Sequence, residues 1–165
     1  MTEKTPASPQ SDAQQQEFAI PDASEGYRLA EAAVWLLLEK KAEETVILDL
    51  RGSSDVCDFF VIAEGNSDVQ VKALARHLRD GLVERGHRVL NVEGMSEGHW
   101  VLLDFFDVII HVFLGETRRY YQLERLWNDA RRLDLDADWF RDSAVAERHP
   151  DLKFTFAPGA ETQGS

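Results

Sequence analysis

Two short runs of aliphatic and aromatic residues near the middle of the chain dominate its hydrophobic pattern. They cover residues 100–105 and 108–114, and only Phe106 and Asp107 separate them. Their content of Val, Ile, Phe and Trp favours strands over a helix. Because both runs are too apolar for a sheet with one face in water, the pattern predicts a sheet that is covered on both faces.

An amphipathic helix is predicted directly after these two strands. Gly115 ends the second apolar run, and Glu116 or Thr117 can begin the helix. Four apolar residues then recur at helical spacing and form one stripe: Leu123, Leu126, Trp127 and Ala130. The predicted centre of the fold is therefore a strand pair that leads into a helix.

The preceding sequence predicts a further helix and an antiparallel strand pair. The helix covers residues 24–44, and the strands cover residues 45–50 and 57–63. Turn residues fill the short connection between the strands. A connection of this length favours an antiparallel pair, since a parallel crossover needs about a dozen residues or more.

A second helix is predicted to begin at Ser67, which forms a capping-box pattern with Gln70. Gly86 ends this helix. The next strand, at residues 89–92, is predicted to run parallel to the strand at 57–63 through a right-handed crossover. Together these elements predict an α/β or α+β fold, with a mixed sheet of about five strands and helices packed on it.

Composition divides the 165 residues into one domain and two tails. Residues 1–23 are polar, with several Gln and Pro, and are predicted to be a disordered tail. Residues 24–133 form the predicted domain. Residues 134–165 are predicted to be a mostly loose acidic extension, which opens with an acidic break at residues 134–138 and contains a short docking segment at Asp138-Trp139-Phe140.

The net charge of −12 is concentrated in the tails. Residues 1–26, 27–133 and 134–165 each carry a net charge of −4, so the tails are more acidic per residue than the domain. Such a chain is not expected to bind DNA or another phosphate backbone through a basic patch. It is suited to a basic protein surface, although solubility explains the charge equally well.

The sequence predicts a cytoplasmic protein. Cys57, the single cysteine, cannot form an internal disulfide and lies in an apolar run, which fits a reducing compartment. No apolar segment reaches the ~18 residues of a membrane span. The N-terminus also lacks the charged-then-apolar pattern of a signal peptide.

The carboxylates near the predicted strand ends do not form a catalytic pattern. A nucleotidyl transferase holds Mg²⁺ on alternate acids of one strand, but Asp104 and Asp107 are three residues apart, as are Asp55 and Asp58. The His and Cys residues lack metal-ligand spacing, and there is no phosphate-binding Gly loop. We therefore expect no enzyme activity, cofactor or metal, and keep an Mg-dependent nucleotidyl transferase as the alternative function.

Aromatic residues are the remaining candidates for a site. Trp100 opens a predicted strand, and Tyr120 and Tyr121 open the helix that follows, so these rings are expected to meet at one edge. Tyr and Trp are common anchors of protein interfaces. Core packing of Trp100 is the competing interpretation, and physical chemistry alone favours it. His111, flanked by Ile110 and Val112, is predicted to be a core histidine with its hydrogen bonds satisfied.

Several stretches of the chain resemble the Iojap-like ribosomal silencing factors (RsfS). They are VEG followed by HWVLLDFFDVIIHVF, then ETRRYYQLERLW, and upstream LDLRGSSDVCDFFVIAEGNSDVQVKALA. The resemblance covers about residues 29–127. It is most specific where R-x-x-Y-x-L-E-x-L-W follows D-x-x-D-V-x-x-H-V. Phe106 departs from the family, which often has a smaller residue there, so a larger contact or an altered turn is expected.

This resemblance implies a function that residue spacing does not show. Family members bind ribosomal protein fourteen of the large ribosomal subunit, block its association with the small subunit, and repress translation during nutrient limitation. Their fold is similar to nucleotidyl transferases without the catalytic acids. By position, Trp100 and Tyr121 match aromatics implicated in partner binding, and Asp104 is expected beside them, facing a Lys or Arg. A homodimer formed through the same edge is left open.

Overall fold

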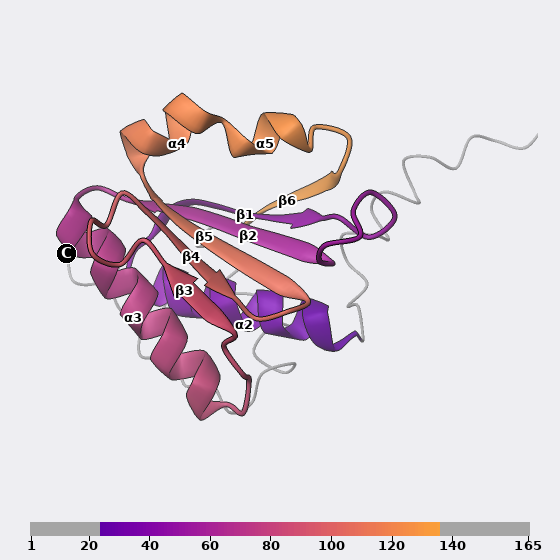
Figure 1. Cartoon of the computed structure of the whole chain (residues 1–165), viewed down its shortest axis with the longest axis horizontal. Helices are drawn as coiled ribbons and strands as arrows, with labels where there is room; N and C mark the ends of the chain where they lie inside the picture. Colours follow the sequence, from indigo (N-terminus) through magenta and orange to yellow (C-terminus); the bar gives the residue numbers. More distant parts are fainter. Residues whose placement is uncertain (1–23, 136–165) are drawn as a thin grey trace, which may run out of the picture.

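A mixed sheet of six strands forms the centre of the described structure, and helices lie on both of its faces (Figure 1). The structure is a computed structural model, and it describes residues 24–135. The helices are α2 (Glu25–Glu39), α3 (Asp68–Glu84), α4 (Gly115–Tyr121) and α5 (Leu123–Leu126). The strands are β1 (Glu43–Asp49), β2 (Phe59–Gly65), β3 (Asn91–Glu93), β4 (Trp100–Asp104), β5 (Val108–Leu114) and β6 (Arg131–Leu135).

The strand order is β3-β4-β5-β2-β1-β6. Strands β2 and β5 pair in parallel, while every other neighbouring pair is antiparallel. The predicted mixed sheet and the antiparallel pairing of β1 with β2 are therefore confirmed. Strand β3 runs in the same direction as β2, as predicted, but β4 and β5 lie between them, and β3 pairs only with β4 among the described strands.

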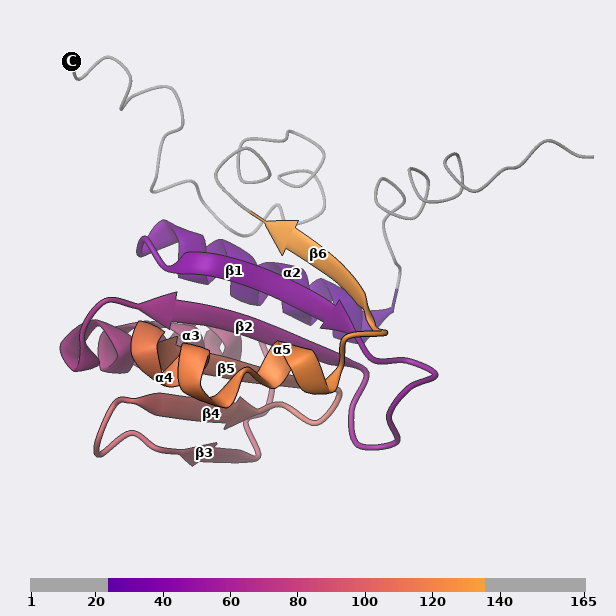
Figure 2. The same cartoon turned by 90° about the horizontal axis from the view of Figure 1, so that it is seen from above.

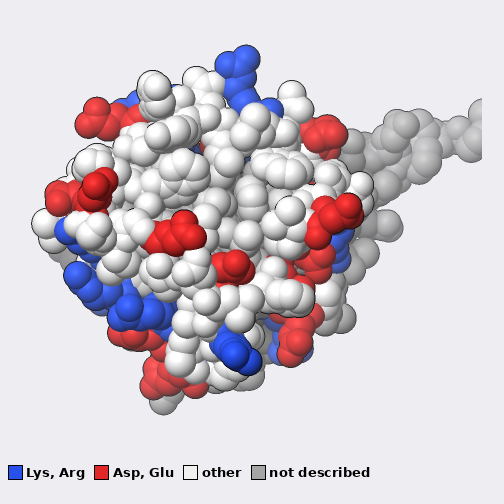
Figure 3. Space-filling model, in the orientation of Figure 1, with Lys and Arg blue, Asp and Glu red and all other residues white. Residues whose placement is uncertain are grey.

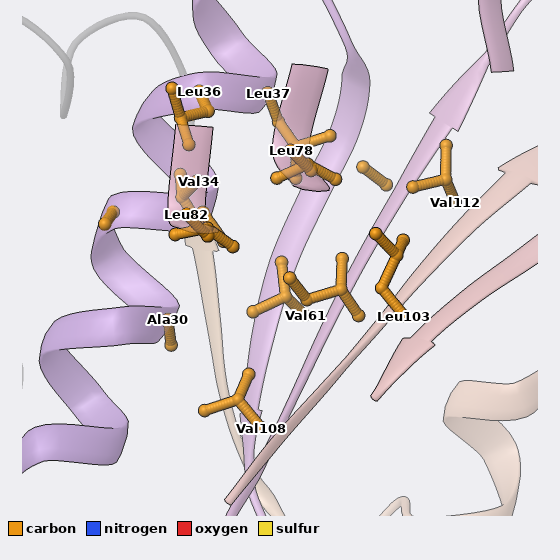
Figure 4. Packing of buried hydrophobic residues seen from close by; sticks show 14 of the residues in the cluster. Ala30, Val34, Leu36, Leu37, Val61, Leu78, Leu82, Leu103, Val108 and Val112 are labelled. Atoms are coloured by element: carbon orange, nitrogen blue, oxygen red, sulfur yellow. The ribbon is translucent and has the colours of Figure 1, made fainter. Parts of the chain in front are cut away.

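Helices α2 and α3 cover one face of the sheet, and α4 and α5 cover the other (Figure 2). Figure 4 shows side chains of α2 and α3 meeting alternate residues of the strands; its labels mark Ala30, Val34, Leu36, Leu37, Val61, Leu78, Leu82, Leu103, Val108 and Val112. A smaller cluster under α4 and α5 contains Val46, Leu48, Leu50, Cys57, Phe60, Ile62, Phe113 and Leu123. The prediction of a sheet covered on both faces is confirmed.

The predicted start of α3 is confirmed by its hydrogen bonds. The Ser67 hydroxyl accepts a hydrogen bond from the backbone N–H of Gln70 at 3.1 Å. The Gln70 side chain accepts one from the N–H of Asn66 at 2.7 Å, one residue before the position that a capping box predicts. The bond from Gln70 satisfies one of the amides that the first helical turn leaves free, and the bond from Asn66 ties the preceding residue to the helix.

Helix α2 ends at Glu39, so the predicted helix end at Glu44 is wrong. Lys41 takes a left-handed conformation (φ 66°), and the N–H groups that follow the helix donate to Leu37 and Leu38. The strand begins earlier than predicted because Glu43 pairs with Glu64 of β2. Pairing with a distant strand decides this boundary, and local helix propensity does not reveal it.

The predicted single helix after β5 is also wrong. Gln122 has a left-handed backbone (φ 50°) that separates α4 from α5, and α5 ends at Leu126. Of the predicted apolar stripe, Leu123 is buried whereas Leu126 is 73% exposed. After the break, Leu123 belongs to the buried cluster that β1 and β2 form on this face of the sheet.

Strand β6 was not predicted, and it occupies the start of the expected acidic break at residues 134–138. It pairs antiparallel with β1, and its Leu133 is buried against the sheet. The predicted domain end at residue 133 falls inside this strand. The predictions for the tail at residues 1–23 and for residues 136–165 lie outside the described residues. Among the described helices, none combines the length and apolar character that a membrane span requires.

Candidate docking site at Trp100 and Tyr121

The structure brings Trp100 and Tyr121 together, as the sequence predicts. Trp100 is the first residue of β4, and Tyr121 is the last residue of α4. Their ring centroids lie 4.9 Å apart at an interplanar angle of 49°. The Trp100 ring also packs on Phe113 of β5, with a centroid distance of 4.8 Å. One side of the indole therefore belongs to the core and the other to a pair of surface aromatics.

Exposure differs among the three aromatic residues of this edge. Trp100 is half-buried, whereas Tyr121 is 53% exposed and Tyr120 is 80% exposed. The two tyrosine rings meet edge to face at 5.0 Å. Trp100 is thus both part of the core and accessible to a partner. Tyr121 lies at the surface, with an apolar ring and a polar hydroxyl group.

A cleft of about 610 Å³ lies beside these rings. Its lining includes Glu97 and His99 before β4, and Glu116 and Tyr120 of α4. The cleft combines aromatic surface with carboxylates. It is suited to a protein segment that offers an apolar side chain next to a Lys or Arg, and the charges would mainly orient the encounter.

Asp104 does not lie beside the aromatic pair, contrary to expectation. It is the last residue of β4, four residues after Trp100 on the same face of the strand. At the usual rise per residue, the two Cα atoms are about 13 Å apart. The Asp104 carboxylate accepts a hydrogen bond from the N–H of Phe106 at 2.9 Å. Its expected contact with a partner's Lys or Arg stays a prediction.

Phe106 occupies the turn between β4 and β5 in a left-handed conformation (φ 79°). This region is unfavourable for a large side chain and is usually taken by Gly, Asn or Asp. The ring is 68% exposed. The turn thus adds an exposed aromatic residue at the Asp104 end of β4.

His111 lies beneath Trp100 and is 3% exposed. Its Nδ1 accepts a hydrogen bond from the indole Nε1 of Trp100 at 3.1 Å. Burial lowers the pKa of His111 to about 4, although the charge of Glu124 acts in the opposite direction. The predicted burial of His111 is confirmed, but the prediction that its hydrogen bonds are satisfied is wrong, because Nε2 has no partner in the described structure. Spacing along the sequence gave no signal for its bond to Trp100.

Arg118 was missed by the sequence reasoning, and it anchors α4 to the sheet. Its side chain is 7% exposed and forms ion pairs with Glu64 at 3.3 Å and with Glu124 at 2.5 Å. It also donates a hydrogen bond to the backbone carbonyl of Glu44 at 2.7 Å. Burial raises the pKa of Glu124, but the hydrogen bond and charge of Arg118 outweigh this and lower it overall. The network holds the helix that carries Tyr121.

The carboxylate of Asp49 and the thiol of Cys57 are engaged or buried in the described structure. Between residues 24 and 135, no group of three or more His, Cys, Asp or Glu side chains is placed to hold a metal ion. Asp49 is occupied by Arg51 at 2.7 Å and Arg131 at 2.6 Å. Burial raises the pKa of the Cys57 thiol to about 11, which keeps it protonated and a poor nucleophile.

Charged side chains of both signs are spread over the side of the molecule that faces the viewer in Figure 3, with β4 near its centre, α4 and α5 above and α3 below. Figure 3 shows Lys and Arg over part of α3 and again above α4 and α5, with Asp and Glu scattered among uncharged residues between and beside them. On the side shown, charges of both signs are mixed, and a continuous basic surface of the kind that a phosphate backbone requires is not seen.

Known proteins resemble the chain over most of its length. A family model described as RsfS, ribosomal silencing factor during starvation, matches residues 22–155. The ribosomal silencing factor RsfS of Bacillus subtilis (strain 168) is 49% identical over 98 residues, which are 59% of this chain and 83% of that relative.

Solved structures share the fold. A crystal structure of a Chromobacterium violaceum protein matches with a TM-score of 0.62 and 34% identity, over 64% of this chain and 88% of that one. A Bacillus halodurans crystal structure matches with a TM-score of 0.58 and 41% identity, over 65% and 97% respectively. The predicted mixed α+β fold is confirmed.

Proposed function

The chain belongs to the ribosomal silencing factor family, and on this premise we propose that it binds ribosomal protein fourteen of the large ribosomal subunit. Bound there, it blocks association with the small subunit and so represses translation during nutrient limitation. It acts by occupying a surface and carries out no reaction. This function would place it with the ribosomes, in the cytoplasm.

The observation that carries the proposal is the Trp100–Tyr121 pair beside an acidic cleft. Interface energy is usually concentrated in a few aromatic or Arg residues that are well packed before the partner arrives. Trp100 meets this description because Phe113 supports one side of its ring. Glu97 and Glu116 in the cleft supply charges complementary to a basic protein surface.

Asp104 is placed to contact the same partner at the edge of the interface. Trp100, Leu102 and Asp104 alternate along β4 and are all half-buried on one face. A typical interface covers about 800 Å² on each partner, which is wide enough to include both ends of a five-residue strand. In this proposal Asp104 meets a Lys or Arg at the rim and contributes less to affinity than the aromatic pair.

Subunit joining in a purified system tests the proposal. The full chain is added to isolated large subunits before small subunits, and the products are separated by sedimentation. We expect the chain to co-sediment with large subunits and to reduce the fraction of joined ribosomes as its concentration rises. Full joining at a saturating concentration, or no co-sedimentation with large subunits, would contradict the proposed function.

Replacing Tyr121 by Ala tests the docking site itself. Because the ring is 53% exposed, we expect the free energy of unfolding to change by less than about 1 kcal/mol. Binding to large subunits should weaken roughly tenfold or more, as for an interface anchor. Val69→Ala is the matched control, since Val69 is 70% exposed on α3, on the other side of the sheet. Equal affinity of the two variants would remove Tyr121 from the site.

A further inference from the structure

The Trp100 indole is held in place by a hydrogen bond to His111, a buried residue of β5. Its Nε1–H donates to Nδ1 of His111 at 3.1 Å. An indole N–H can only donate, and an imidazole nitrogen accepts only while it carries no proton. The contact therefore requires a neutral His111 with its proton on Nε2, and the low-lying pKa of this buried ring agrees with that state.

Aromatic neighbours fix the position of His111. The ring meets Phe60 edge to face with a centroid distance of 4.5 Å, and it stacks on Phe113 at 6.1 Å with an interplanar angle of 14°. Leu102 of β4 is its direct cross-strand partner. A ring enclosed in this way has little freedom to turn. The Nδ1 atom that accepts the hydrogen bond from Trp100 is therefore held in one position.

The other nitrogen of the ring has no hydrogen-bond partner in the described structure. His111 Nε2 is buried and unpaired there. A buried unpaired polar atom costs stability, and an apolar ring of similar size would avoid this cost. Within residues 24–135, the bond to Trp100 is thus the one hydrogen bond formed by this polar ring, which suggests a purpose beyond filling the core.

We propose that His111 is a positioning residue of the docking site and fixes the Trp100 indole against Tyr121 before the partner arrives. This inference rests on the proposed function. Holding an anchor side chain in its bound orientation reduces the ordering cost of association. His111 therefore contributes to affinity without touching the partner.

A double-mutant cycle tests this role. His111→Phe keeps an aromatic ring and removes the acceptor, whereas Trp100→Phe removes the donor. We expect His111→Phe to weaken binding to large subunits roughly three- to tenfold in the parent chain. In the Trp100→Phe background it should change binding less than about twofold, because the interaction is already absent. Equal effects in both backgrounds, or no effect in the parent, would overturn the role.

An NMR measurement on the free chain gives a readout that a core-filling role would not move. The indole N–H signal of Trp100 is assigned by its loss in Trp100→Phe. In His111→Phe we expect this signal to shift and its hydrogen exchange to accelerate, while the other indole signals stay in place. An unmoved Trp100 signal would overturn the inference, even if the variant binds poorly.

These outcomes separate the two proposals. If the parent chain does not bind large subunits, the proposed function fails, and the docking role of His111 fails with it. If the parent binds but the cycle shows no coupling, only the role of His111 fails. Circular dichroism melting of each variant shows whether a loss of binding reflects unfolding instead.

Discussion

His111 and Cys57 both lie in the core of the domain, and burial favours the neutral form of each side chain. The pKa of His111 is lowered to about 4, and that of Cys57 is raised to about 11. Neither group is charged near neutral pH. At the scale of single residues, the Trp100 indole thus rests on an uncharged ring.

The lowered pKa of His111 predicts a loss of stability in mild acid. Its ordinary pKa is 6.5, so between about pH 6.5 and 4 the unfolded chain binds a proton that the folded chain does not. Stability is therefore complete above this window and falls with pH inside it. From pH 7 to pH 5 we expect the free energy of unfolding to drop by roughly 2 kcal/mol from this group.

Urea unfolding of the parent chain and of His111→Phe at pH 7 and pH 5 checks this expectation. The pKa values of Asp49 and Glu124 are lowered from 3.8 and 4.5, so these carboxylates stay largely ionised at pH 5 in the folded chain. The variant should lose less stability between the two pH values. An equal loss in both proteins would show that His111 is not the responsible group.

At the scale of elements, the loop before β4 fixes where the strand begins. Gly94 has φ +88°, and a Cβ at this position would lie 2.0 Å from the backbone carbonyl of Trp100. Real Cβ atoms do not approach so closely, so any other residue must displace the backbone. The loop thus requires Gly94 for a steric reason in addition to its left-handed conformation.

Gly94→Ala is expected to destabilise the domain more than a glycine replacement at an open turn. Gly52→Ala is the matched control, because Gly52 has nearly the same φ (+87°) and no atom lies within 4 Å of its added Cβ. Both changes carry the left-handed penalty, and the clash should add about 1–3 kcal/mol for Gly94. Chemical denaturation measures the difference, and equal midpoints would contradict the predicted clash.

The docking of α4 on the sheet depends on Arg118. Removing its charge leaves Glu64 and Glu124 unpaired, and their side chains are only 14% and 19% exposed. We expect Arg118→Met to cost on the order of 3 kcal/mol of unfolding free energy. Arg119→Met, on the same helix at an exposed position, should cost less than about 0.5 kcal/mol. Thermal or urea unfolding compares the two, and similar small losses would contradict an anchoring role.

At the scale of the whole molecule, net charge sets how the chain meets its partner. The net charge is −12, and Glu97 and Glu116 line the cleft beside Trp100 and Tyr121. A basic protein surface attracts such a molecule, whereas ribosomal RNA repels it. The sign of the salt effect on association therefore reports which of them dominates the approach.

We expect association with large subunits to slow as monovalent salt rises at constant Mg²⁺. Between about 0.05 and 0.3 M salt, the association rate should fall several-fold, because exposed charges are screened, while dissociation changes little. Stopped-flow mixing with a labelled chain measures both rates. Faster association at higher salt would mean that repulsion by RNA dominates, which contradicts docking guided by a basic protein surface.

The sequence by itself determined the features that local physics controls. Apolar runs rich in β-branched and aromatic residues located most strands, period-3.6 stripes located helices, and the Ser67–Gln70 pair marked the start of α3. The strongly apolar runs showed that both faces of the sheet are covered, and the chain position of the aromatics predicted the meeting of Trp100 and Tyr121.

Only the tertiary structure decided the features that depend on distant partners. Strand β6 forms because it pairs with the edge of β1. Its own sequence contains too many charged residues to predict a strand. The helix breaks at Gln122, and burial of Leu123 on the sheet face under α4 and α5 compensates for the lost helical hydrogen bonds. The hydrogen bond from Trp100 to His111 joins two strands at a diagonal, and no pattern within one strand specifies such a contact.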